Sequence, residues 1–263
     1  MRRLLAIGAL LGTGCAAALK EPPPLSSLQH GISGAPAEAL LEEAGAAYAK
    51  RPDLAAVRRA ESLCLEAAQV DEKGTDGLLC AIQAKAWLAE RENDKTVRTD
   101  LAVSAVQAGQ WCQRRAPDSA ACRYWLAVAL GMQARDRPTT AEDGLKRMAQ
   151  LLREAGTIDP TLDEAGPERI LAVLLLRAPG WPVGPGDVEE GLVQAQKAVA
   201  LRPDHAPNQL AVGEGYQKNG MTKQARDAYA RAATLARTPP GAAHPDAPGW
   251  VAEAEKKLRD LKE

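Results

Sequence analysis

The residues of this chain that could do chemistry are few and scattered. None of the three histidines, His30, His205 and His244, is paired with a glutamate or another histidine at the spacing of metal ligands. The sequence contains neither a Gly-x-Ser-x-Gly turn nor a phosphate-binding loop. Acidic residues such as Asp163 and Glu164 are typical of a solvated surface. The sequence therefore predicts no catalytic residue, no metal site and no cofactor, and we expect the protein not to be an enzyme.

Composition narrows the class of protein further. The chain has 263 residues, 46% of them hydrophobic, which is enough for one sizeable core. The formal net charge is −1 and no long basic block occurs, so the sequence predicts no nucleic-acid partner. Alanine and leucine dominate, phenylalanine is absent, and no sustained run of alternating β-branched residues indicates a strand. We therefore expect an all-α protein.

The first residues have the pattern of a targeting segment. Arg2 and Arg3 precede an apolar stretch from Leu4 to Leu11, and small residues lead to Cys15. This pattern resembles a bacterial lipoprotein signal, in which the cysteine becomes the lipidated first residue of the mature protein. The resemblance implies a signal peptide over 1–14 and lipidation at Cys15. An ordinary cleaved signal is the alternative; a spanning helix is disfavoured because the apolar stretch is too short.

The resemblance also implies a location and an anchor. Ala16 rather than aspartate follows the cysteine, which implies sorting to the periplasmic face of the outer membrane in a Gram-negative cell envelope. Three prolines, Pro22 to Pro24, favour an extended chain. We therefore expect residues 15–35 to be a lipidated cysteine and a flexible Pro-rich tether, and residues 36–263 to form the helical domain.

The domain is predicted to consist of helices joined by short polar turns. We expect helices over 37–50, 53–70, 77–91, 96–115, 141–156, 167–177 and 248–262, with others after Ser119, Asp187 and His205. The consecutive apolar residues Ile170 to Leu176 indicate that one helix is buried on all sides. The last helix has a charged outer face, which suits a cap at the end of a repeat array.

The remaining four cysteines are placed to form disulfides. Cys64 and Cys80 lie on either side of a polar turn, and Cys112 and Cys122 lie on either side of Pro117. Each pair would sit at matching heights on two antiparallel helices, and an exported protein permits the bonds. The sequence predicts disulfides Cys64–Cys80 and Cys112–Cys122, with four buried free thiols as the alternative.

The most specific pattern lies in residues 206–237. Gly213 and Tyr216 fall on one predicted helix, and Ala225, Tyr229 and Ala232 fall on the next. This spacing resembles the tetratricopeptide repeat (TPR), in which small residues let two antiparallel helices approach and aromatic residues fill the space between pairs. The resemblance implies a TPR-like right-handed helical solenoid of about five antiparallel helix pairs with a C-terminal capping helix.

A weaker resemblance covers about residues 124–238. Its elements are Trp125-Leu126-Ala127, Gly166-Pro167-x-Arg169 and Pro185-Gly186-Asp187. They are similar to elements of the TPR-like lipoprotein, the T component, of tripartite TRAP-type periplasmic transporters. That resemblance implies docking of a periplasmic solute-binding protein, or a homo-oligomer lined by the groove.

These patterns favour a non-catalytic, membrane-anchored interaction scaffold of the bacterial cell envelope, with the T-component role as the alternative. Its partners would be envelope proteins and, through the lipid, a membrane. Trp181, Arg169 and Asp187 are the candidate partner or ligand surface. For Trp181 the alternative is a plug between helix pairs. Arg169 is expected either in a buried polar network or in the groove, with an ion pair at a helix start as the alternative. Asp187 is also placed to cap a helix, with Glu190 at capping-box spacing.

Overall fold

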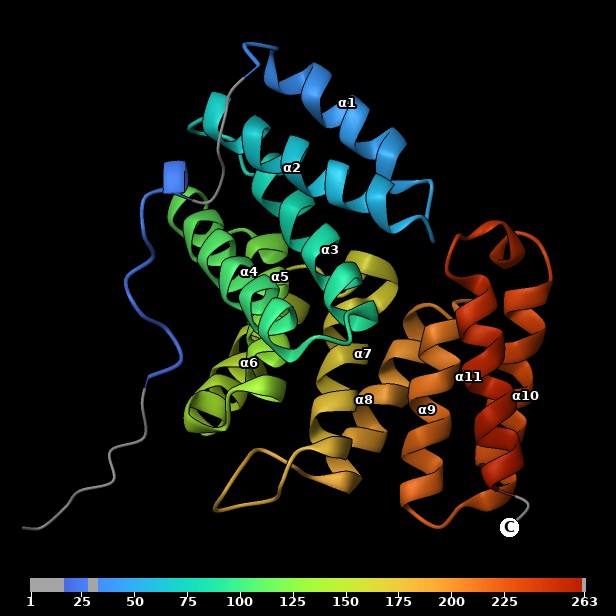
Figure 1. The fold of residues 1–263 in the computed structure, drawn as a ribbon. Coiled ribbons are helices and arrows are strands. Elements are labelled where there is room, and N and C mark those ends of the chain that lie inside the picture. The colour runs from blue at the N-terminus through green and yellow to red at the C-terminus, as the bar shows by residue number, and fades with distance from the viewer. Residues whose placement is uncertain (1–16, 28–32, 262–263) are drawn as a thin grey trace, which may run out of the picture.

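The fold was described from a computed structural model that places residues 17–27 and 33–261. The predicted signal peptide (1–14), Cys15 and His30 lie outside these described residues. Within them the protein is all-α, with eleven α-helices and no strand. Consecutive helices pack antiparallel as pairs that stack into a curved array (Figure 1).

The helices follow one another with short connections. Their bounds are α1 Ala37–Tyr48, α2 Leu54–Val70, α3 Asp76–Arg91, α4 Lys95–Arg115, α5 Ala120–Asp136, α6 Pro138–Ile158, α7 Leu162–Arg177, α8 Val188–Leu201, α9 Ala206–Lys218, α10 Thr222–Arg237 and α11 Ala247–Asp260. Short 3-10 turns occupy Leu25–Ser27 and Gly241–Ala243. The pairs are α1–α2, α3–α4, α5–α6, α7–α8 and α9–α10, and α11 packs on α10 as the predicted cap.

Polar side chains fix several helix starts. The carboxylates of Asp53 and Asp94 accept hydrogen bonds from backbone N–H groups in the first turns of α2 and α4. The hydroxyl of Ser119 accepts from Cys122 at the start of α5 (3.2 Å). Asp187 Oδ1 accepts from the N–H of Glu190 at 3.0 Å, so the predicted cap of α8 is confirmed. Each cap satisfies a donor that the helix leaves unpaired.

Two helices differ from the sequence-based bounds. Helix α6 extends beyond the predicted 141–156 at both ends, because Pro138 fits a first turn, where no N–H is needed. Helix α7 is interrupted at its start: Asp163, Glu164 and Ala165 have φ angles of 49°, 56° and 64°. Its regular part therefore begins after Ala165, close to the predicted start at 167.

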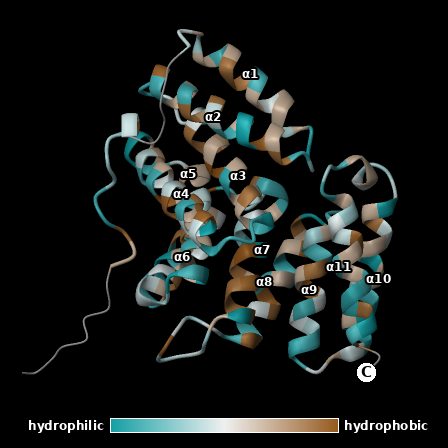
Figure 2. Ribbon diagram, in the orientation of Figure 1, coloured by the Kyte–Doolittle hydropathy of each residue, from teal (hydrophilic) through white to brown (hydrophobic). Residues whose placement is uncertain are grey.

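Helix α7 lies in the middle of the array and packs against α5, α6, α8 and α9. Hydrophobic residues run along most of its length (Figure 2), and Leu171, Leu174 and Leu175 are buried. The apolar run at 170–176 thus corresponds to a central position. No helix among the described residues is both long and apolar enough to cross a membrane.

Residues 17–27 differ from the flexible tether that the sequence predicts over 15–35. They lie against α4 and α6 rather than free of the domain. The N–H of Ala18 donates to Asp143 Oδ2 (2.7 Å), and the side chains of Gln110 and Trp111 donate to the carbonyls of Lys20 and Pro23 (2.7 and 2.9 Å). An extended, proline-rich chain leaves its carbonyls unpaired, and these side chains bind them. The part before the 3-10 turn at Leu25–Ser27 is extended, as the prolines predict, but it is fixed on the helices.

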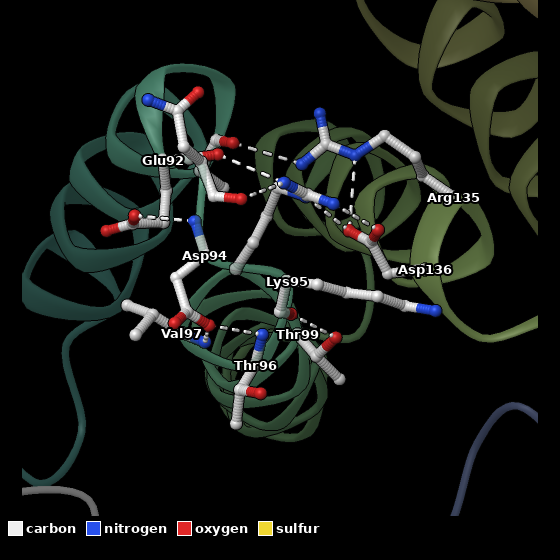
Figure 3. Close-up of polar contacts among 11 residues, drawn as sticks. Glu92, Asp94, Lys95, Thr96, Val97, Thr99, Arg135 and Asp136 are labelled. Carbon is white, nitrogen blue, oxygen red and sulfur yellow. Dashed lines mark hydrogen bonds and ion pairs between the residues drawn. The ribbon is translucent and has the colours of Figure 1, made fainter.

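Charged side chains join the turn between α3 and α4 to the end of α5. Arg98 donates to both carboxylate oxygens of Asp136 at 2.7 Å, and its Nη1 donates to the carbonyl of Glu92 (3.0 Å). Figure 3 shows Asp136 beside Arg135 and the first turn of α4. The hydrogen bonds from Arg98 lower the pKa of Asp136 from 3.8 to about 2.

Candidate functional site

The predicted cysteine pairs come together in the fold. The Cα atoms of Cys64 and Cys80 are 5.6 Å apart, and those of Cys112 and Cys122 are 5.3 Å apart, with the sulfurs at bonding distance in both pairs. Cys64 lies on α2 and Cys80 on α3, whereas Cys112 lies on α4 and Cys122 on α5. Each bridge therefore joins one helix pair to the next.

The TPR-type residues lie at the interface between α9 and α10. A Cβ atom on Gly213 would lie 2.5 Å from Cε1 of Tyr229, so only glycine permits this approach. Tyr229, Ala225 and Ala232 are fully buried, and the hydroxyl of Tyr229 donates to Gln217 Oε1 (2.9 Å). Tyr216 is half-buried and packs against two apolar clusters, one that includes Leu192 of α8 and one that includes Tyr229 of α10. These residues hold the helix pair together, and the buried ones, Ala225, Tyr229 and Ala232, cannot contact a partner.

Arg169 belongs to a buried polar network. Its guanidinium donates to the carbonyls of Asp163 and Glu164, to Asp163 Oδ2 and to Asn208 Oδ1, all within 3.1 Å. Asn208 is fully buried, and its amide nitrogen donates to the carbonyls of Glu164, Ala198 and Arg202. The hydroxyl of Tyr124 donates to Asp163, and burial raises the pKa of that tyrosine well above its usual value.

This network has a structural role that sequence reasoning identified only for Arg169. It ties α5, α7 and α9 together and holds Asp163 to Ala165 in the left-handed region, where non-glycine residues are disfavoured. Neither Asn208 nor Tyr124 stands in a local pattern that signals a polar partner. Their contacts join residues that are distant in the sequence, so only the fold shows them.

His205 and His244 meet through an aromatic side chain. Both contact Trp250, His244 stacked at 4.4 Å between ring centroids and His205 edge-on at 5.6 Å. Burial lowers the pKa of His205 to about 3, so this ring is neutral near pH 7. Within residues 17–27 and 33–261, no group of three or more His, Cys, Asp or Glu side chains could hold a metal ion.

A cavity of about 410 Å³ lies on the inner side of the array. It is bordered by α3, α7, α9 and α11, the helices that come first in their pairs together with the cap. Its lining mixes charged side chains with apolar ones: Glu90, Arg91, Ile170, Val173, Arg177, Leu210, Glu214, Trp250 and Glu253 are among them. Arg177 and Glu214 form a bidentate pair between α7 and α9. This lining offers both charge signs and apolar contacts to an extended chain.

One carboxylate connects the two ends of the array across this cavity. Asp246, just before α11, accepts hydrogen bonds from Trp87 Nε1 (2.8 Å) and Arg91 Nη2 (3.1 Å) on α3. Its other oxygen lies 3.5 Å from Arg51 Nε, in the turn between α1 and α2. The first two helix pairs and the cap therefore meet, and the cavity has a closed side. No local signal in the sequence indicates this contact, which joins residues more than 150 positions apart.

The other proposed partner residues lie outside the cavity. Trp181 is 90% exposed at the tip of the loop between α7 and α8, so it is not a plug between helix pairs. Asp187 is exposed and engaged in capping α8. Of the three candidate residues, Arg169 borders the cavity, Asp187 has a structural role, and Trp181 is a separate exposed feature.

Comparison with solved structures identifies the fold. The structure superposes on a thermophilic TPR protein, TTC0263 of Thermus thermophilus, with a TM-score of 0.62 and 17% sequence identity, covering 84% of this chain and 99% of that chain. The TPR protein YrrB, described as having an unusual peptide-binding site, gives a TM-score of 0.43 at 15% identity over 82% of this chain and 90% of that one. MamA gives 0.47 at 13% identity, over 76% and 92%. No known protein family and no curated protein matches the sequence.

The likeness to the Thermus protein extends over nearly its whole length and most of this chain. Together with the paired antiparallel helices and the α9–α10 packing, it shows that this is a TPR-like protein with an all-α helical solenoid fold. At this level of identity the comparison establishes the fold alone.

Proposed function

We propose that the protein is a non-catalytic interaction scaffold, anchored in the cell envelope by a lipid on Cys15, that binds a partner protein in the cavity bordered by α3, α7, α9 and α11. The observation that supports this proposal is the cavity. It lies on the inner side of a TPR-like array, where stacked helix pairs form an extended binding surface. Its mixed lining suits an extended peptide or one face of a helix.

The lining also suggests how the partner would be held. Arg91 stacks on the ring of Trp87 and donates to Asp246, and Arg177 is paired with Glu214, so these charges are already oriented. Preoriented side chains lose less conformational freedom on binding. Glu253 on α11 lines the cavity and is exposed, so a partner docked in the cavity would lie within reach of this position.

Crosslinking from the rim of the cavity tests this proposal. A photo-reactive residue at Glu253 should capture one envelope protein in intact cells. The matched control is Ala252, which is exposed on the same helix but does not line the cavity. Capture of the same protein from both positions, or of none from Glu253 while the purified protein turns over a substrate, would show that the cavity is not a docking site.

The T-component role makes a narrower claim. It requires that the captured protein be a periplasmic solute-binding protein. The residues that carry the resemblance have internal roles among the described residues: Arg169 is in the buried network and Asp187 caps α8. No observation on this part of the chain favours transport over scaffolding, and the identity of the captured protein separates the two.

The anchor is tested separately. Mass spectrometry of the mature N-terminus should find a lipid on Cys15. An unmodified mature chain that begins at residue 16 or later would show an ordinary cleaved signal instead.

A further inference from the structure

The connection between α7 and α8 is unlike the other turns between paired helices. Residues 178–186 read Ala-Pro-Gly-Trp-Pro-Val-Gly-Pro-Gly and contain no charged side chain. The loop projects from the ends of α7 and α8 at the lower edge of the molecule (Figure 1). Trp181 and Val183 on this loop are 90% and 61% exposed. Large apolar side chains so fully exposed in one loop are uncommon without a binding role.

Two other exposed apolar side chains lie at the same end of the helices as the loop. Val188, at the start of α8, and Met221, in the turn between α9 and α10, are also exposed. These two segments touch, because the side chain of Asn219 donates to the carbonyl of Val188 (3.2 Å). Trp181, Val183, Val188 and Met221 are four of the nine exposed large hydrophobic residues in the described part of the chain. We call this set the apolar edge.

The loop is internally hydrogen-bonded, which lowers the cost of moving it into a less polar medium. Its prolines, Pro179, Pro182 and Pro185, have no N–H to satisfy. Among the remaining residues, the N–H groups of Val183, Gly184, Gly186 and Asp187 donate hydrogen bonds within the loop or to α7. A Cβ on Gly186 would lie 2.1 Å from the carbonyl oxygen of Ala178, so the two sides of the loop are in close contact. An unpaired backbone N–H or C=O group is costly to transfer into lipid, and few N–H donors of this loop lack a partner.

The apolar edge and the start of the described chain lie at the same end of the helices. Ala18 is bonded to Asp143 in the second turn of α6. Helix α7 runs antiparallel to α6, so its last turn, where the loop begins, lies beside the first turns of α6. Cys15 is two residues before Ala17, and two residues span at most about 7 Å. A lipid on Cys15 would therefore start from this end of the molecule.

We propose that the apolar edge rests in the interfacial region of a lipid bilayer, with the ring of Trp181 among the headgroups. The inference rests on the lipid anchor of the proposed function. Tryptophan favours this region because its ring is apolar and its N–H needs a polar partner. The anchor and the loop then form two contacts that fix how the protein stands on the membrane and turn the 410 Å³ cavity to a defined side.

The charges near the loop determine whether its binding to a membrane should depend on anionic lipid and on salt. Asp187, Glu189 and Glu190 follow directly, so the loop has no attraction for anionic headgroups. Binding through the apolar edge should therefore not require anionic lipid, and on anionic vesicles it should not weaken as the salt concentration rises.

The test uses the full chain on vesicles of phosphatidylethanolamine and phosphatidylglycerol with brominated acyl chains, which quench tryptophan on contact. We expect flotation with the vesicles and quenching of a tryptophan signal that is lost in the Trp181→Phe variant. That signal should be protected from acrylamide in the water phase. The matched control is Trp181→Phe/Ile158→Trp, because Ile158 is half-exposed at the opposite end of the helices. Its new tryptophan should be quenched by acrylamide and not by bromine.

The outcomes separate the anchor from the apolar edge. Flotation without bromine quenching of Trp181 would overturn this inference and leave the anchor intact. No flotation at all would overturn both. Protection of Trp181 from acrylamide only when envelope proteins are added, with no bromine quenching, would assign the loop to a protein partner and also overturn the inference.

Discussion

The two halves of the array join their helix pairs by different means. In the N-terminal half, Cys64 and Cys80 lie between the first and second pairs, and Cys112 and Cys122 between the second and third. In the C-terminal half, the junctions are polar: Tyr124 reaches Asp163 across the third junction, and Asn208 reaches Arg169 across the fourth. The two N-terminal junctions carry a covalent cross-link in addition to polar contacts such as Arg98–Asp136, whereas the C-terminal junctions depend on buried hydrogen bonds and packing.

The two kinds of junction do not differ in the size of the side chains that they bury. The C-terminal half retains TPR-type packing, in which Tyr229 fills the space beside Gly213. Alanine is frequent in the buried clusters of both halves, and Trp87 and Leu88 supply large side chains in the N-terminal half. A disulfide adds to such packing because it closes a loop in the unfolded chain.

The largest expected change in stability comes from the two disulfides of the N-terminal half. Replacing all four cysteines, Cys64→Ala/Cys80→Ala with Cys112→Ala/Cys122→Ala, should lower the free energy of unfolding by about 2–4 kcal/mol per bridge, because each closes a loop in the unfolded chain. Urea unfolding of wild type and variant measures it. Alanine is chosen rather than serine because Cys64, Cys112 and Cys122 are fully buried, and a serine there would bury a hydroxyl.

Thiol labelling provides the control for this first prediction. The denatured, unreduced protein should contain no reactive thiol at these positions, and reducing the wild type should shift its unfolding to that of the variant. If the four thiols label without reduction, the N-terminal junctions are held by packing alone and the contrast between the halves disappears.

The next effect concerns the polar half. Asn208→Ala should lower the free energy of unfolding by about 2–3 kcal/mol, because the buried amide would no longer donate to the carbonyls of Glu164, Ala198 and Arg202 or accept from Arg169. The measurement is again urea unfolding. The matched control is Gln196→Ala on α8, an exposed amide, which should change stability by less than about 0.5 kcal/mol. Equal effects of the two substitutions would mean that the network does not hold the junction.

Sequence patterns predicted local features well. Helix identity, the cap at Asp187, the pairing of cysteines across turns and the TPR-type contacts of Gly213 all depend on residues close in the sequence or on a regular period. Such signals survive in a single sequence because helical geometry converts spacing directly into position.

The sequence could not show contacts set by the curvature of the array. Asp246 meets Trp87 and Arg91 only because the solenoid brings its ends together. Proline content correctly indicated that the chain before Leu25 is extended. It could not indicate that Gln110 and Trp111 bind their carbonyls, since those donors lie about 90 residues away. Interactions at such separations have no local pattern.

A third prediction compares a glycine from each half. Gly213→Ala should destabilise the protein by about 1–3 kcal/mol, because its new methyl group overlaps the ring of Tyr229 and forces α9 and α10 apart. Gly45→Ala on α1 should stabilise it by about 0.5–1 kcal/mol, because nothing lies within 4 Å of its Cβ and alanine favours a helix. Opposite signs in urea unfolding are expected. A stabilised Gly213→Ala variant would show that α9 and α10 are not in close contact.

The last prediction returns to the N-terminal half and uses pH. Hydrogen bonds from Arg98 lower the pKa of Asp136 to about 2 in the folded protein, against its usual value of 3.8. Because the folded pKa is depressed, the stabilisation is complete above about pH 4 and is lost as the pH falls toward 2. We expect a loss of about 1–2 kcal/mol in this window, seen as a fall in the urea midpoint. Asp136→Asn should already lack this contribution at pH 7 and should show a shallower acid dependence than wild type. If the two proteins lose stability in parallel between pH 4 and 2, the Arg98–Asp136 pair does not stabilise the junction of α4 with α5, and the cysteine bridge there acts without it.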